Sequence, residues 1–391
     1  GNIDWISPLN DYFCTKQSEH TENNMTFFKR WNNIVGWAVF AIAAAVYLMT
    51  MEPVSSLWDC SEFIATSYKL EVGHPPGAPL FMMLARLATL FAFGNPDYVG
   101  VAVNAMNSIA SAFCILFLFW TITHLARRLV TRGGGELTQA NTLAVLGAGI
   151  VGALAYTFTD TFWFSAIEGE VYALSSMFTA LVVWLMLKWE EQADEPHSSR
   201  WIVLIAYLMG LSIGVHILNL LTIPALVFIY YFRKTEKVTF KGMVYATLIA
   251  GAILLFINNI IIPYTVYVGA MVDLFFVNTL GLPVNSGIVL FALALILGWA
   301  EQLEQDTALP AAARQKACGI RTQSEKLRAL IEDLNLTSKL QYGAQPLRCR
   351  PTQAGPLLRR LAAEFCDSPL AARCTVALEI APDADKAILD A

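Results

Sequence analysis

Residues 57–81, LWDCSEFIATSYKLEVGHPPGAPLF, form the most polar segment between the long apolar runs of the first 300 residues. Its ionisable side chains precede a rigid Pro75-Pro76-Gly77 corner and are Asp59, Glu62, Lys69, Glu71 and His74. Charged groups beside a membrane span are costly to hold there, so a cluster of them is a candidate functional site. We therefore expect this segment to lie at the outer mouth of a membrane-embedded protein.

The composition predicts a membrane protein. Of the 391 residues, 56% are apolar and 15% are charged, whereas soluble domains carry about 25% charged residues. The net charge of −5 and the lack of a basic patch with interleaved aromatic residues argue against a nucleic-acid partner. The seven cysteines form no CxxC pair, the five histidines are scattered, and HEXXH is absent. We therefore predict neither a metal site nor a cofactor.

The apolar runs predict an all-α polytopic membrane protein with about seven to nine membrane helices, since about 20 apolar residues cross a bilayer. The expected spans are 34–51, 101–125, 143–158, 171–187, two helices within 201–232 that break at 214–216, 244–262 and a run from about residue 284. Residues 78–93 are too short to span and are expected to be interfacial or re-entrant. Residues 159–170 are expected to form an external loop, and residues 263–283 are expected to be external.

Basic residues give the expected orientation, because Lys and Arg gather on the cytoplasmic side. In this threading the basic clusters fall on one side, at 29–30, 127–132, 188–200 and 233–241. Six acidic or imidazole side chains fall on the other side: Asp59, Glu62, His74, Glu168, Glu170 and His216. We therefore expect an integral membrane protein whose active face is extracytoplasmic.

Asp59 and Glu62 are the candidate catalytic residues. Their spacing of three places both carboxylates on one face if the segment is helical. A carboxylate can take the proton of an acceptor hydroxyl when its surroundings adjust its pKa. Two alternatives stay open: both groups are solvated loop charges, or Asp59 caps the following helix, since Asp-x-x-Glu resembles a capping box.

Six further residues are candidates for binding substrate. His74 belongs to a shaped turn that is either a plain corner or part of the site. Arg86 suits a phosphate, with snorkelling to the headgroups as the alternative. Glu168 and Glu170 open a helix, where the helix dipole also favours acids. His216 and Asn219, at the break in 201–232, either line a cavity or are satisfied polar residues.

The ends of the chain differ from its centre. Residues 1–24 are polar, show no helical period and precede Met25, so we expect a poorly ordered leader or foreign segment. After about residue 292 the chain becomes charged, with helical spacing from Ile320 to Leu334. Residues 374–380 are expected to form a strand.

The motifs WDCSEF…VGHPPGAPLF, AIEGEVYAL and GVHILNLLTIPAL make residues 25 to about 292 similar to the N-terminal membrane region of a bacterial family. That family is related to transmembrane protein O-mannosyltransferases and is grouped with the GT-C glycosyltransferases. The resemblance implies a GT-C-like fold in the bacterial inner membrane and a polyprenyl-phosphate-linked sugar as donor. It also implies an acceptor polypeptide and a catalytic acid in the first external loop, a position that Asp59 occupies.

The tail resembles a different family. SEKLRALIEDLNLTSKLQYGAQPLR is similar to the second dimerisation helix of a sensor histidine kinase, and ILGWAEQLEQD to the end of the first. The tail contains no His, so no kinase activity is expected. We expect residues 293–345 to be a helical hairpin-like dimerisation fragment, with contacts through 301–342, and 346–391 the truncated start of an ATP-binding-type domain, joined at 292–297 as in a chimera.

Three functions remain open from the sequence. The first is a membrane glycosyltransferase, whose activity in this chain is uncertain because family members continue through further spans. The second is a transporter or flippase-like protein in which the same acids bind ions or substrate. The third is a membrane-anchored signalling fragment.

Overall fold

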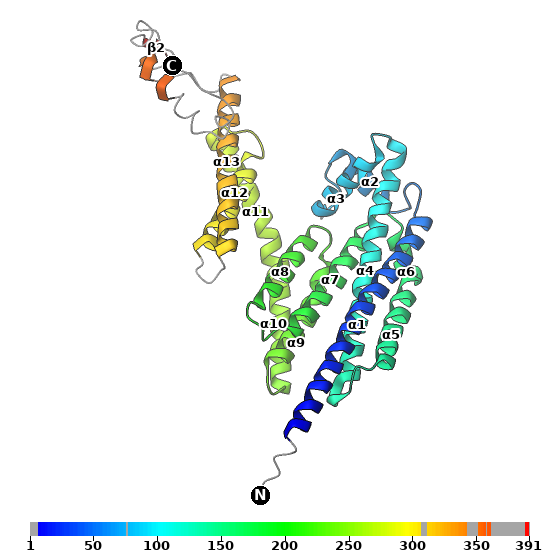
Figure 1. The fold of residues 1–391 in the computed structure, drawn as a ribbon. Helices are drawn as coiled ribbons and strands as arrows, with labels where there is room; N and C mark the ends of the chain where they lie inside the picture. Colours follow the sequence, from blue (N-terminus) through cyan, green and yellow to red (C-terminus); the bar gives the residue numbers. More distant parts are fainter. Residues whose placement is uncertain are drawn as a thin grey trace. The chain divides into compact units, whose positions relative to one another are not determined.

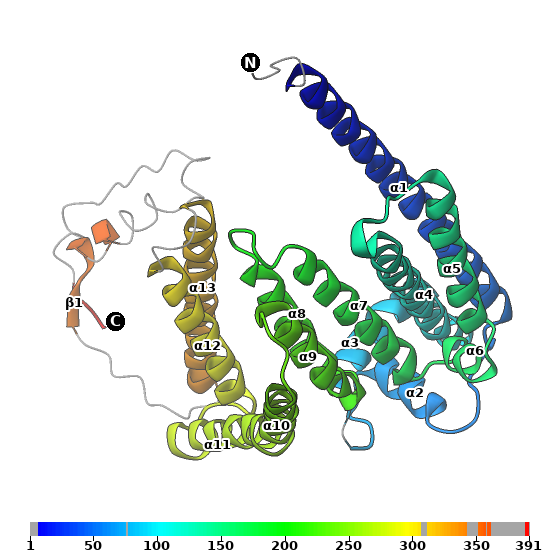
Figure 2. The ribbon, with the colours of Figure 1, turned by 90° about the horizontal axis from the view of Figure 1, so that it is seen from below.

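The computed structural model describes residues 7–75, 77–305, 311–341, 351–356, 358–360 and 388–390. It divides into two compact units, residues 1–259 and 260–391, which are treated separately below (Figures 1 and 2). The helices of the first unit are α1 (Ser7–Thr50), α2 (Cys60–Lys69), α3 (Pro79–Thr89), α4 (Val99–Thr131), α5 (Gln139–Thr157), α6 (Asp160–Ala166), α7 (Val171–Glu191), α8 (Ser199–Ile213), α9 (Ile223–Lys234) and α10 (Phe240–Phe256). The second unit contains α11 (Ile262–Leu280), α12 (Ser286–Gln305), α13 (Ala311–Gln341), β1 (Pro351–Gln353) and β2 (Ile388–Asp390).

Helix α4 is the centre of the first unit and packs against α1, α5 and α7 (Figure 1). Its buried side chains Ile115 and Phe119 belong to one core cluster together with Ala43 of α1 and Val145 of α5. At the other end of α4, Val103 packs in a second cluster with side chains of α2, α3 and α7. The small helices α2 and α3 are therefore held against one end of the long-helix bundle.

Three polar side chains of α4 attach two loops to that end of the bundle. Asn104 Nδ2 donates to the carbonyls of Glu52, at 2.7 Å, and Val54, at 2.9 Å. Asn107 Nδ2 donates to the carbonyls of Glu168, at 2.7 Å, and Glu170, at 2.6 Å.

The third tether is Ser108, whose Oγ donates to the Ala166 carbonyl at 3.1 Å. Asn104 and Asn107 are fully buried. Buried carbonyls without a partner are expensive, so these side chains fix the loops that precede α2 and α7.

In the second unit, α11, α12 and α13 pack in sequence order. The Asp273 carboxylate accepts from the amides of Asn285, at 3.1 Å, and Gly287, at 2.9 Å, and so joins α11 to the start of α12. Arg321 Nε lies 2.8 Å from Glu304 Oε2 and pairs α13 with α12. Strands β1 and β2 are three residues each and pair antiparallel.

The prediction of an all-α polytopic membrane protein is confirmed. Within the described residues, seven helical segments are long and apolar enough to cross a membrane: Asn23–Thr50, Pro96–Gly134, Gln139–Thr157, Val171–Glu191, Ile217–Lys234, Phe240–Leu280 and Ser286–Gln305. Residues 79–92 are a shorter apolar helix, and the helix in 201–232 breaks after Ile213, both as predicted.

One expectation of irregular structure is wrong. The polar residues 7–24 are helical, since α1 begins at Ser7 and no Gly or Pro interrupts the chain between Pro8 and Gly36. Residues 263–283, which are expected to be external, are mostly α11. Pro263 is tolerated in its first turn, where no amide hydrogen is needed, and Gly281 ends it with φ 64°.

Some predictions about the ends of the chain stay predictions. The proposed junction at 292–297 lies inside the continuous helix α12. The predicted strand at 374–380 lies outside the described residues. Dimerisation through 301–342 and the origin of residues 1–24 also stay predictions.

We expect Asn107→Ala to lower the free energy of unfolding by about 1–3 kcal/mol, since it removes two buried hydrogen bonds worth about 0.5–1.5 kcal/mol each. Both carbonyls keep one partner: Glu168 accepts from the Glu170 amide at 2.9 Å, and Glu170 is the N-cap of α7. Thermal unfolding of the full chain in detergent measures the change. Asn33→Ala is the matched control, because Asn33 is exposed on α1 and should melt like the parent chain. Equal melting of both variants would contradict the tethering role.

Candidate functional site

The segment 57–81 folds into α2, a turn and α3. Asp59 occupies the N-cap position of α2, with φ −79° and ψ −9°, and makes no side-chain capping bond. The capping-box alternative is therefore not what the structure adopts, and the Asp59 carboxylate remains half-exposed. Because residues 60–69 are helical, Asp59 and Glu62 lie on one face, as the spacing predicted.

Glu62 binds His74 through both of its oxygens. Glu62 Oε1 accepts from the His74 backbone amide at 2.6 Å, and Oε2 lies 3.0 Å from His74 Nδ1. On the other side of the imidazole, Nε2 lies 3.9 Å from Asp59 Oδ2. His74 is thus a member of the site and lies between the two carboxylates.

The turn after α2 is shaped to allow this contact. A Cβ added at Gly73 would lie 3.2 Å from Glu62 Oε1, so glycine leaves room for the carboxylate. Gly77 has φ +85°, in the left-handed region that favours glycine, and its amide donates to the His74 carbonyl at 2.8 Å. At the start of α3, the Leu80 amide donates to the Gly214 carbonyl at 2.7 Å.

The pair changes the charge state of both residues. The pKa of Glu62 is lowered from 4.5, first because the His74 amide donates to it and then because the imidazole does. The pKa of His74 is raised from 6.5, mainly by its hydrogen bond to Glu62, with the charge of Asp59 also contributing. A carboxylate beside an imidazolium is therefore favoured over the range between the two pKa values.

Glu168 and Glu170, in the loop before α7, are both buried. Ser56 Oγ donates to Glu168 Oε2 at 2.6 Å, and the Val171 amide donates to Glu170 Oε2 at 3.2 Å. Burial raises the pKa of Glu170 to about 7, with smaller contributions that include the charges of Glu168 and Asp59. The charges of Asp59 and His74 both act on the pKa of Glu170, so these three residues belong to one site.

The structure does not bring Arg86 and Asn219 into this group. Arg86 Nη1 donates to the Tyr68 carbonyl at 2.7 Å near the end of α2, and its guanidinium lies 5.4 Å from the Tyr68 ring centroid. Asn219 is fully buried and donates to Ser212 Oγ at 2.8 Å across the helix break. Both residues support the scaffold.

His216 lies beside the site and forms no ion pair with the residues that the structure describes. Its ring centroid is 5.4 Å from that of Tyr172, and its Nδ1 accepts from the Leu218 amide at 3.2 Å. Burial lowers its pKa, so the imidazole is neutral at pH 7. His216 therefore contributes packing against Tyr172.

The sequence reasoning missed Ser56, Asn104, Asn107 and Ser108. The signal was available for the last three, which recur at spacings of three and one within an apolar run. Polar side chains on one stripe of a membrane helix bind another polar group. Their spacing identified the stripe, but the partners were loop carbonyls, which sequence spacing does not reveal.

Three side chains of the site are close enough to bind one cation. Ligand atoms of Asp59, Glu62 and His74 all lie within 4.8 Å of one another. The sequence predicted no metal, because the histidines are scattered and the fold alone brings His74 to the carboxylates. In this structure the same atoms already pair with one another.

A groove of about 470 Å³ begins close to this site. Its lining includes Tyr172, Ser175, Thr179 and Val183, which follow one face of α7 away from Glu170. Side chains of α4 and α5 complete the lining and are mostly apolar. The groove is therefore suited to a chain-like apolar group that runs from the site along the bundle.

Residues 59–239 match the model of the family described as the Protein O-mannosyl-transferase TMEM260 N-terminal domain. The chain is similar to "Protein O-mannosyl-transferase TMEM260" of Mus musculus, with 32% identity over 45% of this chain and 22% of the relative. The similarity to "Protein O-mannosyl-transferase tmem260" of Dictyostelium discoideum is 25% identity over 56% of this chain and 27% of the relative. No solved structure matches.

We expect the free energy of unfolding to fall as the pH rises from 4.5 to about 7, because Glu170 loses its proton over this range. Its folded-state pKa of about 7 lies above the ordinary value of 4.5, so the folded state favours the protonated form. Stability from this group is complete below 4.5 and is lost as pH rises through 7, by up to about 3 kcal/mol.

Thermal melting of the full chain from pH 4.5 to 8 measures this loss. Glu170→Gln keeps an acceptor for the Val171 amide and should flatten the profile, whereas Asp160→Asn, at an exposed acid of α6, should not. An unchanged slope in Glu170→Gln would rule Glu170 out as its source.

The comparisons confirm the predicted resemblance for residues 59–239, a stretch that contains Asp59, Glu62, His74, Glu168 and Glu170 and includes the loop tethers of α4. The chain spans about a quarter of the length of the curated relatives it matches.

Proposed function

We propose that this chain forms the catalytic end of a GT-C-type membrane glycosyltransferase that transfers a sugar from a polyprenyl-phosphate donor to a hydroxyl of an acceptor polypeptide. The observation that carries the proposal is the free carboxylate of Asp59 beside the Glu62–His74 pair. This group and the buried Glu168 and Glu170 lie within the segment that matches O-mannosyl-transferase relatives. The acceptor is proposed to be a Ser or Thr side chain.

The proposed reaction is a single displacement. Asp59 takes the proton of the acceptor hydroxyl while the hydroxyl oxygen attacks the anomeric carbon of the sugar. The bond from that carbon to the phosphate oxygen breaks, and its electron pair leaves with the lipid phosphate, so the configuration inverts. The imidazolium of His74 stabilises the negative charge that develops on the phosphate.

The contacts favour Asp59 over Glu62 as the base. Both Glu62 oxygens accept hydrogen bonds from His74, and the lowered pKa makes Glu62 a weaker proton acceptor. Asp59 makes no capping bond, and its nearest charged partner is the imidazole at 3.9 Å. Glu62 is therefore proposed to position His74, and Asp59 to accept the proton.

The groove along α7 supports a lipid-linked donor. It begins at Tyr172, two residues after Glu170, and extends into the bundle past Val183. An isoprenoid chain in this groove would leave its phosphate near His74. Because membrane lipid delivers the donor in this scheme, no cofactor beyond the donor is required.

The charge distribution supports an extracytoplasmic active face in a bacterial inner membrane. At the opposite end of α4 and α7, Arg127 pairs with Glu191 and Arg128 with Glu190. Lys and Arg concentrate at the cytoplasmic ends of spans, so this end is proposed to be cytoplasmic. The acidic end then faces away from the cytosol.

We expect Asp59→Asn to reduce transfer by about 100-fold or more, since it removes the general base. Donor binding should stay within about threefold, because the amide keeps the shape of the side chain. The assay is transfer from polyprenyl-phosphate mannose to a Ser/Thr peptide by the full chain, with donor binding measured separately. Asp160→Asn, an exposed acid at the same end, is the control.

Retention of more than a tenth of the activity in Asp59→Asn would exclude Asp59 as the base. Loss of solute or lipid uptake in a vesicle assay, with no transfer by the parent chain, would favour the transporter alternative instead.

We expect the transfer rate to fall at basic pH as His74 loses its proton. Its raised pKa puts this fall above pH 6.5, with the protonated, active form on the acidic side. The profile of kcat/KM between pH 5 and 9 measures it. In His74→Gln this limb should disappear and the rate should be low throughout.

An unchanged basic limb in His74→Gln would mean that another group titrates.

Treatment with a chelator distinguishes ion pairing within the site from metal binding by the same side chains. The pairing described above predicts activity that EDTA leaves intact, whereas loss with EDTA and recovery with a divalent cation would indicate metal binding by Asp59, Glu62 and His74.

A further inference from the structure

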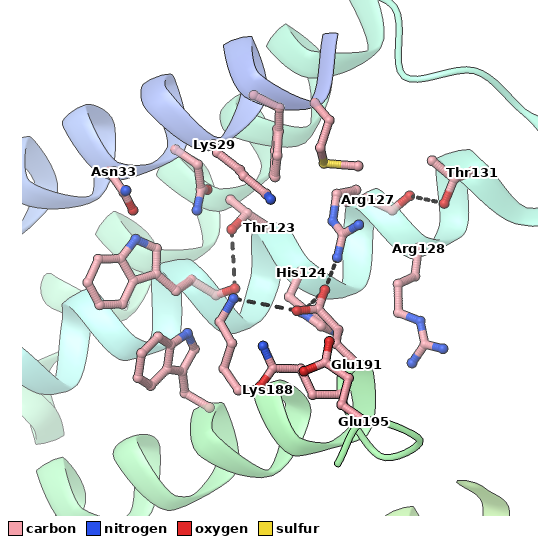
Figure 3. A pocket seen from close by; sticks show the side chains of 16 residues that line it. Lys29, Asn33, Thr123, His124, Arg127, Arg128, Thr131, Lys188, Glu191 and Glu195 are labelled. Atoms are coloured by element: carbon pink, nitrogen blue, oxygen red, sulfur yellow. Dashed lines mark hydrogen bonds and ion pairs between the residues drawn. The ribbon is translucent and has the colours of Figure 1, made fainter. Parts of the chain in front are cut away.

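A second large pocket lies at the basic end of the first unit, far along the bundle from the carboxylates. It has a volume of about 780 Å³ and is lined by side chains of α1, α4 and α7, with the residues that follow α7. Figure 3 shows Lys29 of α1, His124 and Arg127 of α4, and Lys188 and Glu191 of α7 around one space. We call it the basic-end pocket. The proposed transfer reaction makes no use of it.

The charge in this pocket is positive on balance. Its permanent cations are Lys29, Arg127, Arg128 and Lys188, and the carboxylates that face them are Glu190, Glu191 and Glu195. One carboxylate, Glu191, pairs with Arg127 and also lies 3.5 Å from Lys188 Nζ. No ion pair of Lys29 occurs within the part of the chain that the structure describes.

Three residues of this pocket carry a buried polar atom that has no hydrogen-bond partner among the described residues: Asn32 Oδ1, Trp120 Nε1 and His124 Nε2. The Trp120 atom faces α1, since a Cβ added at Gly36 would lie 2.7 Å from it. His124 is only 6% exposed, and its Nδ1 lies 3.4 Å from Glu191 Oε1. An unmet buried polar atom costs about 1–3 kcal/mol, so a polar ligand that reaches Asn32 or His124 would regain part of that cost.

The cations favour an anion with several oxygens. Lys29, Arg127 and Lys188 come from three different helices and surround one space. A phosphate group offers enough acceptor oxygens for all three at once.

An aromatic column continues from the pocket along the bundle. Trp120 and Trp184 stack at 5.2 Å, and Phe117 lies 5.5 Å from Trp184. Phe113 follows Phe117 at 6.3 Å, and Trp37 of α1 lies 6.3 Å from both Phe113 and Trp120. None of these five rings is fully buried. A headgroup pocket next to an apolar strip of this kind matches an amphipathic molecule.

We infer that the basic-end pocket binds the phosphate headgroup of an anionic membrane lipid, whose apolar chain lies along the aromatic column. The phosphate contacts Lys29, Arg127 and Lys188, and the chain lies against Trp184, Phe117 and Trp37. This site is distinct from the donor groove, which begins at the acidic end of α7. It does not depend on the proposed transfer activity.

Native mass spectrometry of the full chain, with titrated lipid, tests this inference. We expect phosphatidic acid to bind with a stoichiometry of one and phosphatidylcholine to bind at least tenfold more weakly. Lys29→Gln should weaken phosphatidic acid about tenfold, which is the loss of roughly 1.4 kcal/mol. Lys237→Gln removes the same charge from an exposed loop near the same end and should leave the affinity unchanged.

A second variant tests the apolar half of the site. Trp184→Ala should weaken phosphatidic acid and leave the binding of inorganic phosphate unchanged. Equal effects of Lys29→Gln and Lys237→Gln would overturn the inference, because the lipid would then respond only to the general charge of this end. Inorganic phosphate that binds as tightly as phosphatidic acid would also overturn it and would indicate a soluble anion.

Discussion

The two carboxamides of Asn104 and Asn107 hold the acidic end of this molecule together. Each donates two hydrogen bonds to backbone carbonyls of one loop. Both carboxamides are fully buried, so an N–H group left without these carbonyls would carry the full cost of an unpaired buried donor. The donors come from a rigid central helix, and the loops therefore take their positions from α4.

This constraint reaches the candidate site directly. Asn107 binds the carbonyls of Glu168 and Glu170, so one side chain fixes the backbone on which both buried acids stand. A Cβ added at Gly169, between the two acids, would lie 3.0 Å from Asn104 Oδ1. The loop therefore packs on α4 as closely as a glycine allows. The position of Glu170 follows from the hydrogen bond that Asn107 donates to its backbone carbonyl.

The sequence was sufficient for the class of fold and for most of the site. Apolar run length predicted the spans, and charge placement predicted that Asp59, Glu62, His74, Glu168 and Glu170 would gather at one end. Run length gave no prediction of the helix in 263–283, where Pro263 is tolerated in the first turn of α11. Arg86 and Asn219 were chosen by residue type, and only the fold showed that their partners were Tyr68 and Ser212.

An acidic site that is proposed to receive a phosphate must overcome repulsion between like charges. Two features of the structure reduce that repulsion. The pKa of Glu170 is raised to about 7, so its charge is partly lost at neutral pH, and the raised pKa of His74 favours the imidazolium between Asp59 and Glu62. Both effects depend on geometry: burial under the loop for Glu170 and contact with Glu62 for His74. The basic-end pocket has the opposite charge and needs no such adjustment to attract an anion, so the two lipid phosphates proposed here would be attracted to the two ends of one bundle by different means.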